Sequence, residues 1–76
     1  MKMTEAIATL TADGWTVVDR PGRYGMCTIL AHGDTRAAVS RSSITFRRGM
    51  RILAVHSTLI LTPQTVSMVA REIVAQ

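Results

Sequence analysis

Two histidines and a single cysteine are the side chains of this sequence that most often carry chemistry. His32 and His56 stand 24 residues apart, and with Cys27 they form no pair of close ligands of the kind that binds zinc. We therefore expect no metal site. His56 ends an apolar run and precedes Ser57, which is typical of a strand-end residue bonded to its neighbours, and it is the one weak catalytic candidate. His32 precedes a glycine and is interpreted as a turn residue.

The acids and glycines give no better basis for an active site. The five acids offer no pair at helical or strand spacing whose pKa values would be pushed apart, which acid and base catalysis by carboxylates requires. No glycine precedes Lys-Ser or Lys-Thr, so a phosphate-binding loop is excluded. Cys27 lies in an apolar stretch and is expected in the core as a small hydrophobe. The sequence predicts a protein that is not an enzyme and binds no cofactor.

Arginine is the most informative residue type. Nine basic residues, eight of them Arg, stand against five acids and give a net charge of +4. No acid lies between Thr35 and Ala70, yet five arginines fall between positions 36 and 51. Because guanidinium matches phosphate and carboxylate in shape, this run favours a polyanion or an acidic protein face as partner, the alternative being a solvated basic surface. The expected contact residues are Arg20, Arg23, Tyr24, Arg36, Arg41, Arg47, Arg48 and Arg51.

The turn around Gly49 sharpens this expectation. Arg47 and Arg48 stand directly before it, so we expect both side chains to project into solvent without supporting the core. Met50 is interpreted first as a core gap-filler, although an exposed Met beside Arg48 and Arg51 would add an adaptable contact.

Length and composition bound the architecture and the compartment. Seventy-six residues allow one domain, residues 1–76, because a chain this short buries little surface. With Cys27 as the only cysteine there is no internal disulfide, which favours a reducing cytoplasm. The sequence shows neither a signal peptide nor the ~20 apolar residues of a membrane span. We expect a cytoplasmic protein and leave open whether it forms a homodimer.

Hydrophobic periodicity predicts a helix at each end of the chain. Apolar residues recur at helical spacing from Met3 to Leu10, with Thr4 as N-cap and Gly14 as the stop, so the first helix is expected over residues 4–13. Near the other end, Thr62 as N-cap and Pro63 at the first helical position begin a second helix with one apolar face.

Between the helices the sequence is typical of strands. They are expected at 15–19, 24–31 and 51–56, with 35–40 and 44–46 as further strand pieces that form one strand or two. A Pro-Gly turn is expected at 20–23, and 59–61 is either strand or lead-in to the last helix. We predict an α+β fold with an antiparallel meander of three to four strands flanked by two helices, in the order α-β-β-β-α. Both helices are expected on one face of the sheet, leaving the other face free.

Both ends of the chain resemble the HicA toxin family, small proteins with a fold like that of double-stranded-RNA-binding domains that cleave messenger RNA and are held by HicB antitoxins. Residues 6–10 with Asp13-Gly14-Trp15 resemble the first helix and the Gly-Trp entry to the first strand. The last strand, the turn and the final helix of that family are similar to Val55-His56-Ser57, residues 61–66 and residues 71–73. This resemblance covers about half of the chain and favours RNA as the ligand.

The chain departs from that family where the chemistry would be. The family has Gly-Ser-His after its first strand, and this sequence reads Gly22-Arg23-Tyr24. A phenol with a pKa near 10 cannot accept a proton as an imidazole does at neutral pH, about 3.5 units lower. The segment from Met26 to Met50 is also longer than the family pattern.

Three functions are compatible with these observations. The first is a non-enzymatic module that contacts nucleic acid, RNA above all, through its arginines. The second is a phage or mobile-element inhibitor, similar to anti-CRISPR proteins, that occupies an acidic or nucleic-acid-binding face of a host protein or nucleoprotein complex. The third is an RNA-cleaving toxin in which His56 or His32 replaces the missing histidine. None of them involves a membrane.

Overall fold

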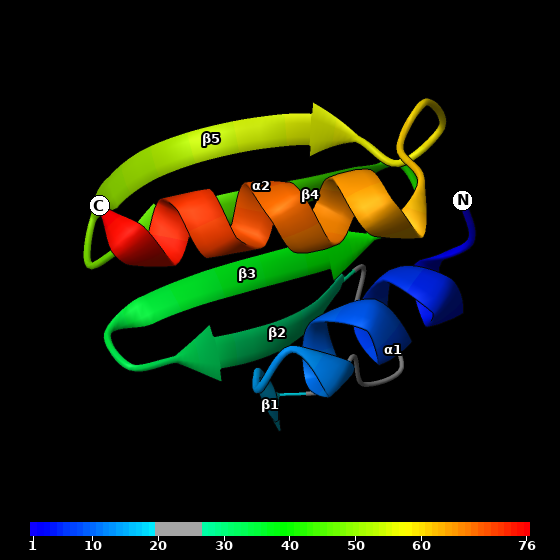
Figure 1. The fold of residues 1–76 in the computed structure, drawn as a ribbon. Helices are drawn as coiled ribbons and strands as arrows, with labels where there is room; N and C mark the ends of the chain where they lie inside the picture. The colour runs from blue at the N-terminus through cyan, green and yellow to red at the C-terminus, as the bar shows by residue number, and fades with distance from the viewer. Residues whose placement is uncertain (20–26) are drawn as a thin grey trace.

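A computed structural model describes residues 1–19 and 27–76. These residues form one helix, five strands and a second helix, in that order along the chain (Figure 1). The elements are α1 (Met3–Ala12), β1 (Thr16–Asp19), β2 (Cys27–His32), β3 (Thr35–Ser40), β4 (Ser43–Arg48), β5 (Arg51–Ser57) and α2 (Pro63–Ala75). The predicted α+β class is confirmed, but the predicted count of three to four strands was too low. The middle contains two separate strands, β3 and β4. The Ser43 amide donates to the Ser40 hydroxyl at 3.1 Å and closes the short turn between them.

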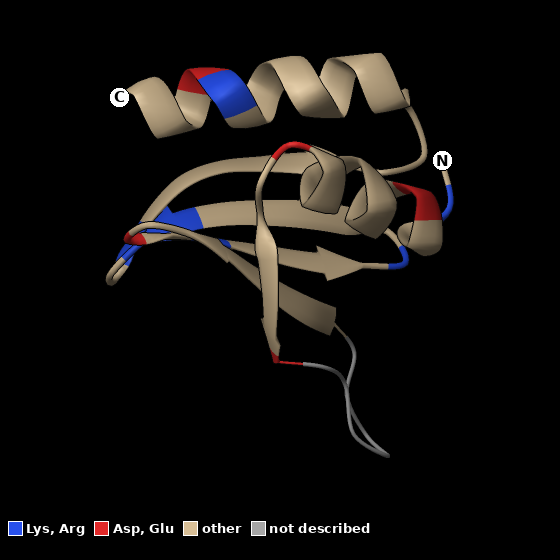
Figure 2. Cartoon of the chain, turned by 60° about the horizontal axis from the view of Figure 1, so that its bottom comes forward, with Lys and Arg blue, Asp and Glu red and all other residues tan. Residues whose placement is uncertain are grey.

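The five strands form one antiparallel sheet in the order β1-β2-β3-β4-β5. Both helices lie on the same side of it, as Figure 2 shows, so the expected free face exists. We call the side of the sheet without helices the helix-free face. The predicted turn at 20–23 and the start of the predicted strand at 24–31 lie outside the described residues. Residues 58–60 form a turn, so the apolar run there does not extend β5. Within the described residues, neither helix is long and apolar enough to span a membrane.

The core lies between the sheet and the two helices. Alternate residues of β2, β3 and β4, including Leu30, Val39 and Phe46, are fully buried against Leu10 of α1 and Val66 of α2. Trp15 closes this layer, with its ring edge-on to Phe46 at 5.8 Å between centroids.

Cys27 does not lie in this core. Its neighbour Thr28 is buried on the helix side, so strand alternation turns the half-buried Cys27 towards the helix-free face.

The helix ends follow their capping residues in part. Thr62 accepts a hydrogen bond from the Thr65 amide at 3.3 Å, and Pro63 begins α2, as predicted. Gly14 ends α1 with a φ of 96°, also as predicted. The predicted N-cap of α1 was wrong: that position is Lys2, whose side chain makes no capping bond, and Thr4 lies inside the first turn.

The last turn of α2 carries no basic residue of its own, and Arg48 of β4 supplies one. Its guanidinium donates to the carbonyls of Ile73 and Gln76, both at 3.2 Å, and to the Thr35 hydroxyl at 3.1 Å. It also lies 3.3 Å from the exposed carboxylate of Asp34. These bonds satisfy carbonyls that a helix end leaves free, and the positive charge is favourable there. The expectation that Arg48 projects freely into solvent is therefore wrong.

This arrangement predicts different stabilities for two neighbouring variants. Arg48→Ala should lower the free energy of unfolding by about 1–2 kcal/mol, because it removes charged hydrogen bonds from partly buried groups. Arg47→Ala, at an exposed position, should change it by less than about 0.5 kcal/mol. Urea unfolding followed by circular dichroism measures both. Equal losses in the two variants would contradict the role given to Arg48.

Candidate functional site

The sheet register gathers four of the predicted contact arginines at one end. Arg36 of β3 lies directly opposite Arg47 of β4, and Arg48 of β4 lies directly opposite Arg51 of β5. We call these four residues the arginine cluster. Figure 2 shows basic segments at the end of the sheet where the β2–β3 and β4–β5 turns lie. The sequence showed that these arginines are near each other along the chain, and pairing of three strands makes them neighbours in space.

The members of the cluster differ in how they are held. The Arg36 guanidinium donates to the carbonyls of Gly33 and Thr35, at 2.9 and 3.2 Å, which fixes its position half-buried at the sheet end. Arg48 is bound to α2, whereas Arg47 and Arg51 are exposed. Among the described residues, only Arg48 of this cluster lies within 4 Å of a carboxylate. In this part of the chain, three guanidinium groups therefore have no carboxylate partner: those of Arg36 and Arg47 on the helix-free face, and that of Arg51 on the same face as Arg48.

Two tight turns stand beside the cluster. Each has two loop residues with a glycine first, Gly33 before Asp34 and Gly49 before Met50, and both glycines have a φ of 60°. Asp34 and Met50 have negative φ, which matches the type II′ turn of tight hairpins. Met50 is fully exposed between Arg48 and Arg51. It is a surface residue next to the arginines and fills no gap in the core.

The other predicted contact residues do not join the cluster. Arg41 is exposed in the β3–β4 turn, at the opposite end of the sheet, where it lines a hollow with Met1, Lys2 and neighbouring residues of α1. The backbone of that turn is held by Thr58, whose hydroxyl donates to the Arg41 carbonyl at 2.8 Å. Arg20, Arg23 and Tyr24 lie outside the described residues.

The helix-free face continues from the cluster along the sheet. Arg36 and Arg47 stand in a row across the strands with Ala31 on one side and Ile52 on the other. The next row is Asp19, Ile29, Ala38, Thr45 and Val55, and beyond it lie Cys27 and the serines Ser40, Ser43 and Ser57. Residues directly opposite each other share one face, so this surface is built mainly of small side chains.

Two apolar residues of β5 stand out on that face. Ile52 and Val55 are 64% and 60% exposed. Both reach the helix-free side because β5 has a bulge opposite Phe46 and Arg47, which shifts the alternation by one residue. The hydrophobic pattern of residues 51–56 predicts a regular strand without this bulge. An extra residue in a strand leaves no reliable mark on a hydrophobic pattern.

The two histidines are not brought together. His56 of β5 lies half-buried opposite Ile44, on the helix side of the sheet. His32 ends β2, which β3 and β4 separate from β5, and its ring lies 5.5 Å from that of Trp15. Across the described part of the chain, no group of three or more His, Cys, Asp or Glu side chains lies together. His32 is thus more than a turn residue, since it packs against the edge of the core.

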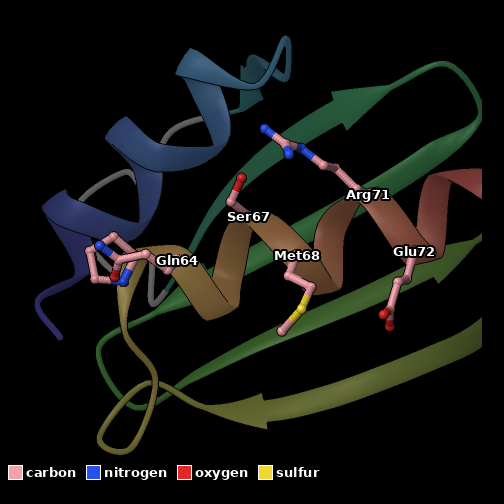
Figure 3. A pocket seen from close by; sticks show the side chains of 6 residues that line it. Gln64, Ser67, Met68, Arg71 and Glu72 are labelled. Atoms are coloured by element: carbon pink, nitrogen blue, oxygen red, sulfur yellow. The ribbon is translucent and has the colours of Figure 1, made fainter.

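A small pocket lies beside His32, between the end of α1 and α2. Asp13, Trp15 and Arg71 form part of its wall, and its volume is about 180 Å³. Small-molecule sites usually measure ~300–1,000 Å³, so this one has room for a few waters and no nucleotide. A larger hollow runs along the outside of α2 past Gln64, Met68 and Glu72 (Figure 3). All of its lining residues come from one helix, so no polar groups converge there on a ligand.

Asp13 ties the two helices together at the small pocket. Its carboxylate accepts a short hydrogen bond from the Ser67 hydroxyl and lies 3.4 Å from the Arg71 guanidinium. The Ser67 bond lowers the pKa of Asp13 most, and the charge and bond of Arg71 lower it further, against partial burial, which raises it. Asp13 therefore has a structural role.

Comparison of the chain with protein-family models, with curated proteins and with solved structures finds no match in any of the three. Function is therefore inferred from the geometry of the arginine cluster and its surroundings.

The lowered pKa of Asp13 predicts how stability depends on pH. A carboxylate whose pKa is lower in the folded than in the unfolded state stabilises the fold above about pH 4, and this stabilisation is lost as pH falls through the folded-state pKa. Asp13→Asn should therefore be less stable than the wild type at pH 7, and the gap should narrow as pH falls below about 4. Urea unfolding between pH 2 and pH 7 measures the gap.

Ser67→Ala provides the matched test, because it removes the bond that lowers the pKa of Asp13 most. Its gap to the wild type should also narrow as pH falls below about 4. A gap between the wild type and Asp13→Asn that stays constant across this pH range would contradict the account.

Proposed function

We propose that this protein is a small binding module that contacts the phosphates of nucleic acid through its arginine cluster and carries out no chemistry of its own. The resemblance of both chain ends to the HicA family makes RNA the first ligand to test. Among the described residues, three guanidinium groups of the cluster have no carboxylate partner, and guanidinium binds phosphate oxygens through paired N–H donors.

One observation carries this proposal: two pairs of like charges stand directly opposite each other at the same sheet end. Like charges at opposed positions of an antiparallel sheet destabilise it. Asp34 offsets part of this repulsion for Arg48, and among the described residues no carboxylate lies within 4 Å of the guanidinium groups of the other three arginines. A phosphate backbone bound across the cluster would neutralise these charges, which gives the repulsion a functional reason.

The surroundings of His56 support a role without chemistry. Its partner across the strands is Ile44, and the arginine cluster lies at the far end of the same two strands. A general base needs a substrate proton within about 3 Å, directly or through one water. Phosphates bound at the cluster would lie several residues along β5 from His56. A toxin that cleaves RNA with His56 is therefore the weakest of the three functions.

Binding of labelled RNA across a salt series tests the proposal by fluorescence anisotropy. With three phosphate contacts, the logarithm of the binding constant should fall with the logarithm of salt concentration with a slope of about −2 to −3. Arg47→Ala should weaken binding and make this slope less negative by about 1. Arg41→Ala removes one equal charge at the other end of the sheet and should change the slope little.

Three results bear on this proposal separately. A folded protein that shows no binding at low salt would refute it. Equal effects of Arg47→Ala and Arg41→Ala would show that net charge matters and the cluster does not. RNA that is cut by the wild type and stays intact with His56→Ala would establish the toxin function in its place.

A second function is favoured by the apolar side chains of β5. Ile52 and Val55 are exposed beside Arg36 and Arg47 on the helix-free face, and exposed apolar side chains next to charged ones are typical of protein interfaces. This arrangement would suit an inhibitor that covers the nucleic-acid site of a host complex, as anti-CRISPR proteins do. Such an inhibitor would need the apolar residues as much as the arginines.

Inhibition of DNA binding by purified CRISPR effector complexes tests that function. The wild type should block DNA binding by one of them. Ile52→Thr with Val55→Thr, which keeps both positions β-branched, should weaken the block about tenfold or more while the protein stays folded. If all complexes tested bind DNA normally in the presence of the wild type, the inhibitor hypothesis loses its support.

A further inference from the structure

Among residues 1–19 and 27–76, the helix-free face has none of the aromatic side chains that hold single strands. Proteins that bind single-stranded nucleic acid regardless of sequence stack its bases on aromatic rings. In the described part of the chain, Trp15 and Phe46 are buried in the core, and the rows beside the arginine cluster consist of aliphatic and small polar residues and the acid Asp19. Bases laid along these rows would find no aromatic ring.

Strand pairing sets the backbone positions of the four arginines in a fixed array, and hydrogen bonds hold two of their side chains. Arg36 is fixed by two backbone carbonyls, Arg48 by α2, and all four stand on strands that are paired up to a two-residue turn. Such an array gains most from a ligand whose phosphates are already spaced regularly. A double helix offers that spacing, whereas a single strand would lose conformational freedom on binding.

The position of the cluster points in the same direction. It lies beside the turns of two neighbouring hairpins, with Met50 fully exposed at one turn. Paired strands lie about 5 Å apart, and the major groove of B-form DNA, about 12 Å wide, admits a two-stranded ribbon. The minor groove of an RNA duplex is wide and shallow, so its two backbones are equally open to a hairpin end.

We infer that the ligand of the arginine cluster is a double helix. The ends of the β2–β3 and β4–β5 hairpins contact its phosphates, and the protein does not read its base sequence. This inference rests on the proposed function and makes it more specific. Duplex RNA and duplex DNA share the required chemistry, and the experiment separates them.

The test compares ligands with equal numbers of phosphates. Anisotropy is measured for a 20-base-pair RNA duplex, a DNA duplex of the same sequence and a 40-nucleotide unstructured single strand of RNA, all at one salt concentration. At least one duplex should bind about tenfold more tightly than the single strand. A duplex with a scrambled sequence should bind equally well.

Two double variants assign the preference to the cluster. Arg47→Ala with Arg51→Ala leaves every hydrogen bond of Arg36 and Arg48 in place and should abolish the preference for duplex. Lys2→Ala with Arg41→Ala removes the same charge from the opposite end and should keep it. Circular dichroism confirms that both variants are folded.

The outcomes separate the inference from the function on which it rests. Single-strand binding that equals or exceeds duplex binding overturns the inference and leaves the proposed function standing. A duplex preference that survives loss of Arg47 and Arg51, or that depends on base sequence, also overturns it. No binding of any nucleic acid by the folded protein overturns both.

Discussion

The pairing of β3 with β4 is the constraint on which the rest of the structure depends. Ala37 opposite Phe46 places that ring in the core, and the same register places Arg36 opposite Arg47 on the other face. Side chains alternate along a strand, so a shift of β4 by one residue would turn Phe46 to solvent and Arg47 into the core. Burial of one aromatic ring therefore fixes the position of two arginines.

Neighbouring arginines divide structural and binding roles between the two faces of the sheet. Arg48 faces the helices and binds the carbonyls at the end of α2, where its charge is partly used. Arg47 faces away from them and is exposed, with its charge free for a partner. This division follows from strand alternation, and it means that counting arginines in the sequence overstates the charge available for binding.

The cluster carries a cost that the rest of the fold must offset. Opposed like charges weaken the β3–β4 and β4–β5 pairings at the sheet end. The tight turns at Gly33 and Gly49, the bonds of Arg36 to its own turn and the attachment of Arg48 to α2 hold that end in place. The arginine cluster has few acidic partners for its charges, so these turns and hydrogen bonds hold the sheet end that carries it.

The sequence by itself determined the two helices, the α+β class and the concentration of arginine, because helical periodicity, the Thr62-Pro63 start and charge are local properties of the chain. It could not separate Arg48 from Arg47, since the carbonyls that bind Arg48 come from residues 25 and 28 positions away. Nor could it show the bulge in β5 that exposes Ile52 and Val55 together. Only the tertiary structure decided which arginines stand together, because cross-strand neighbours are set by register and helix docking, which depend on the whole core.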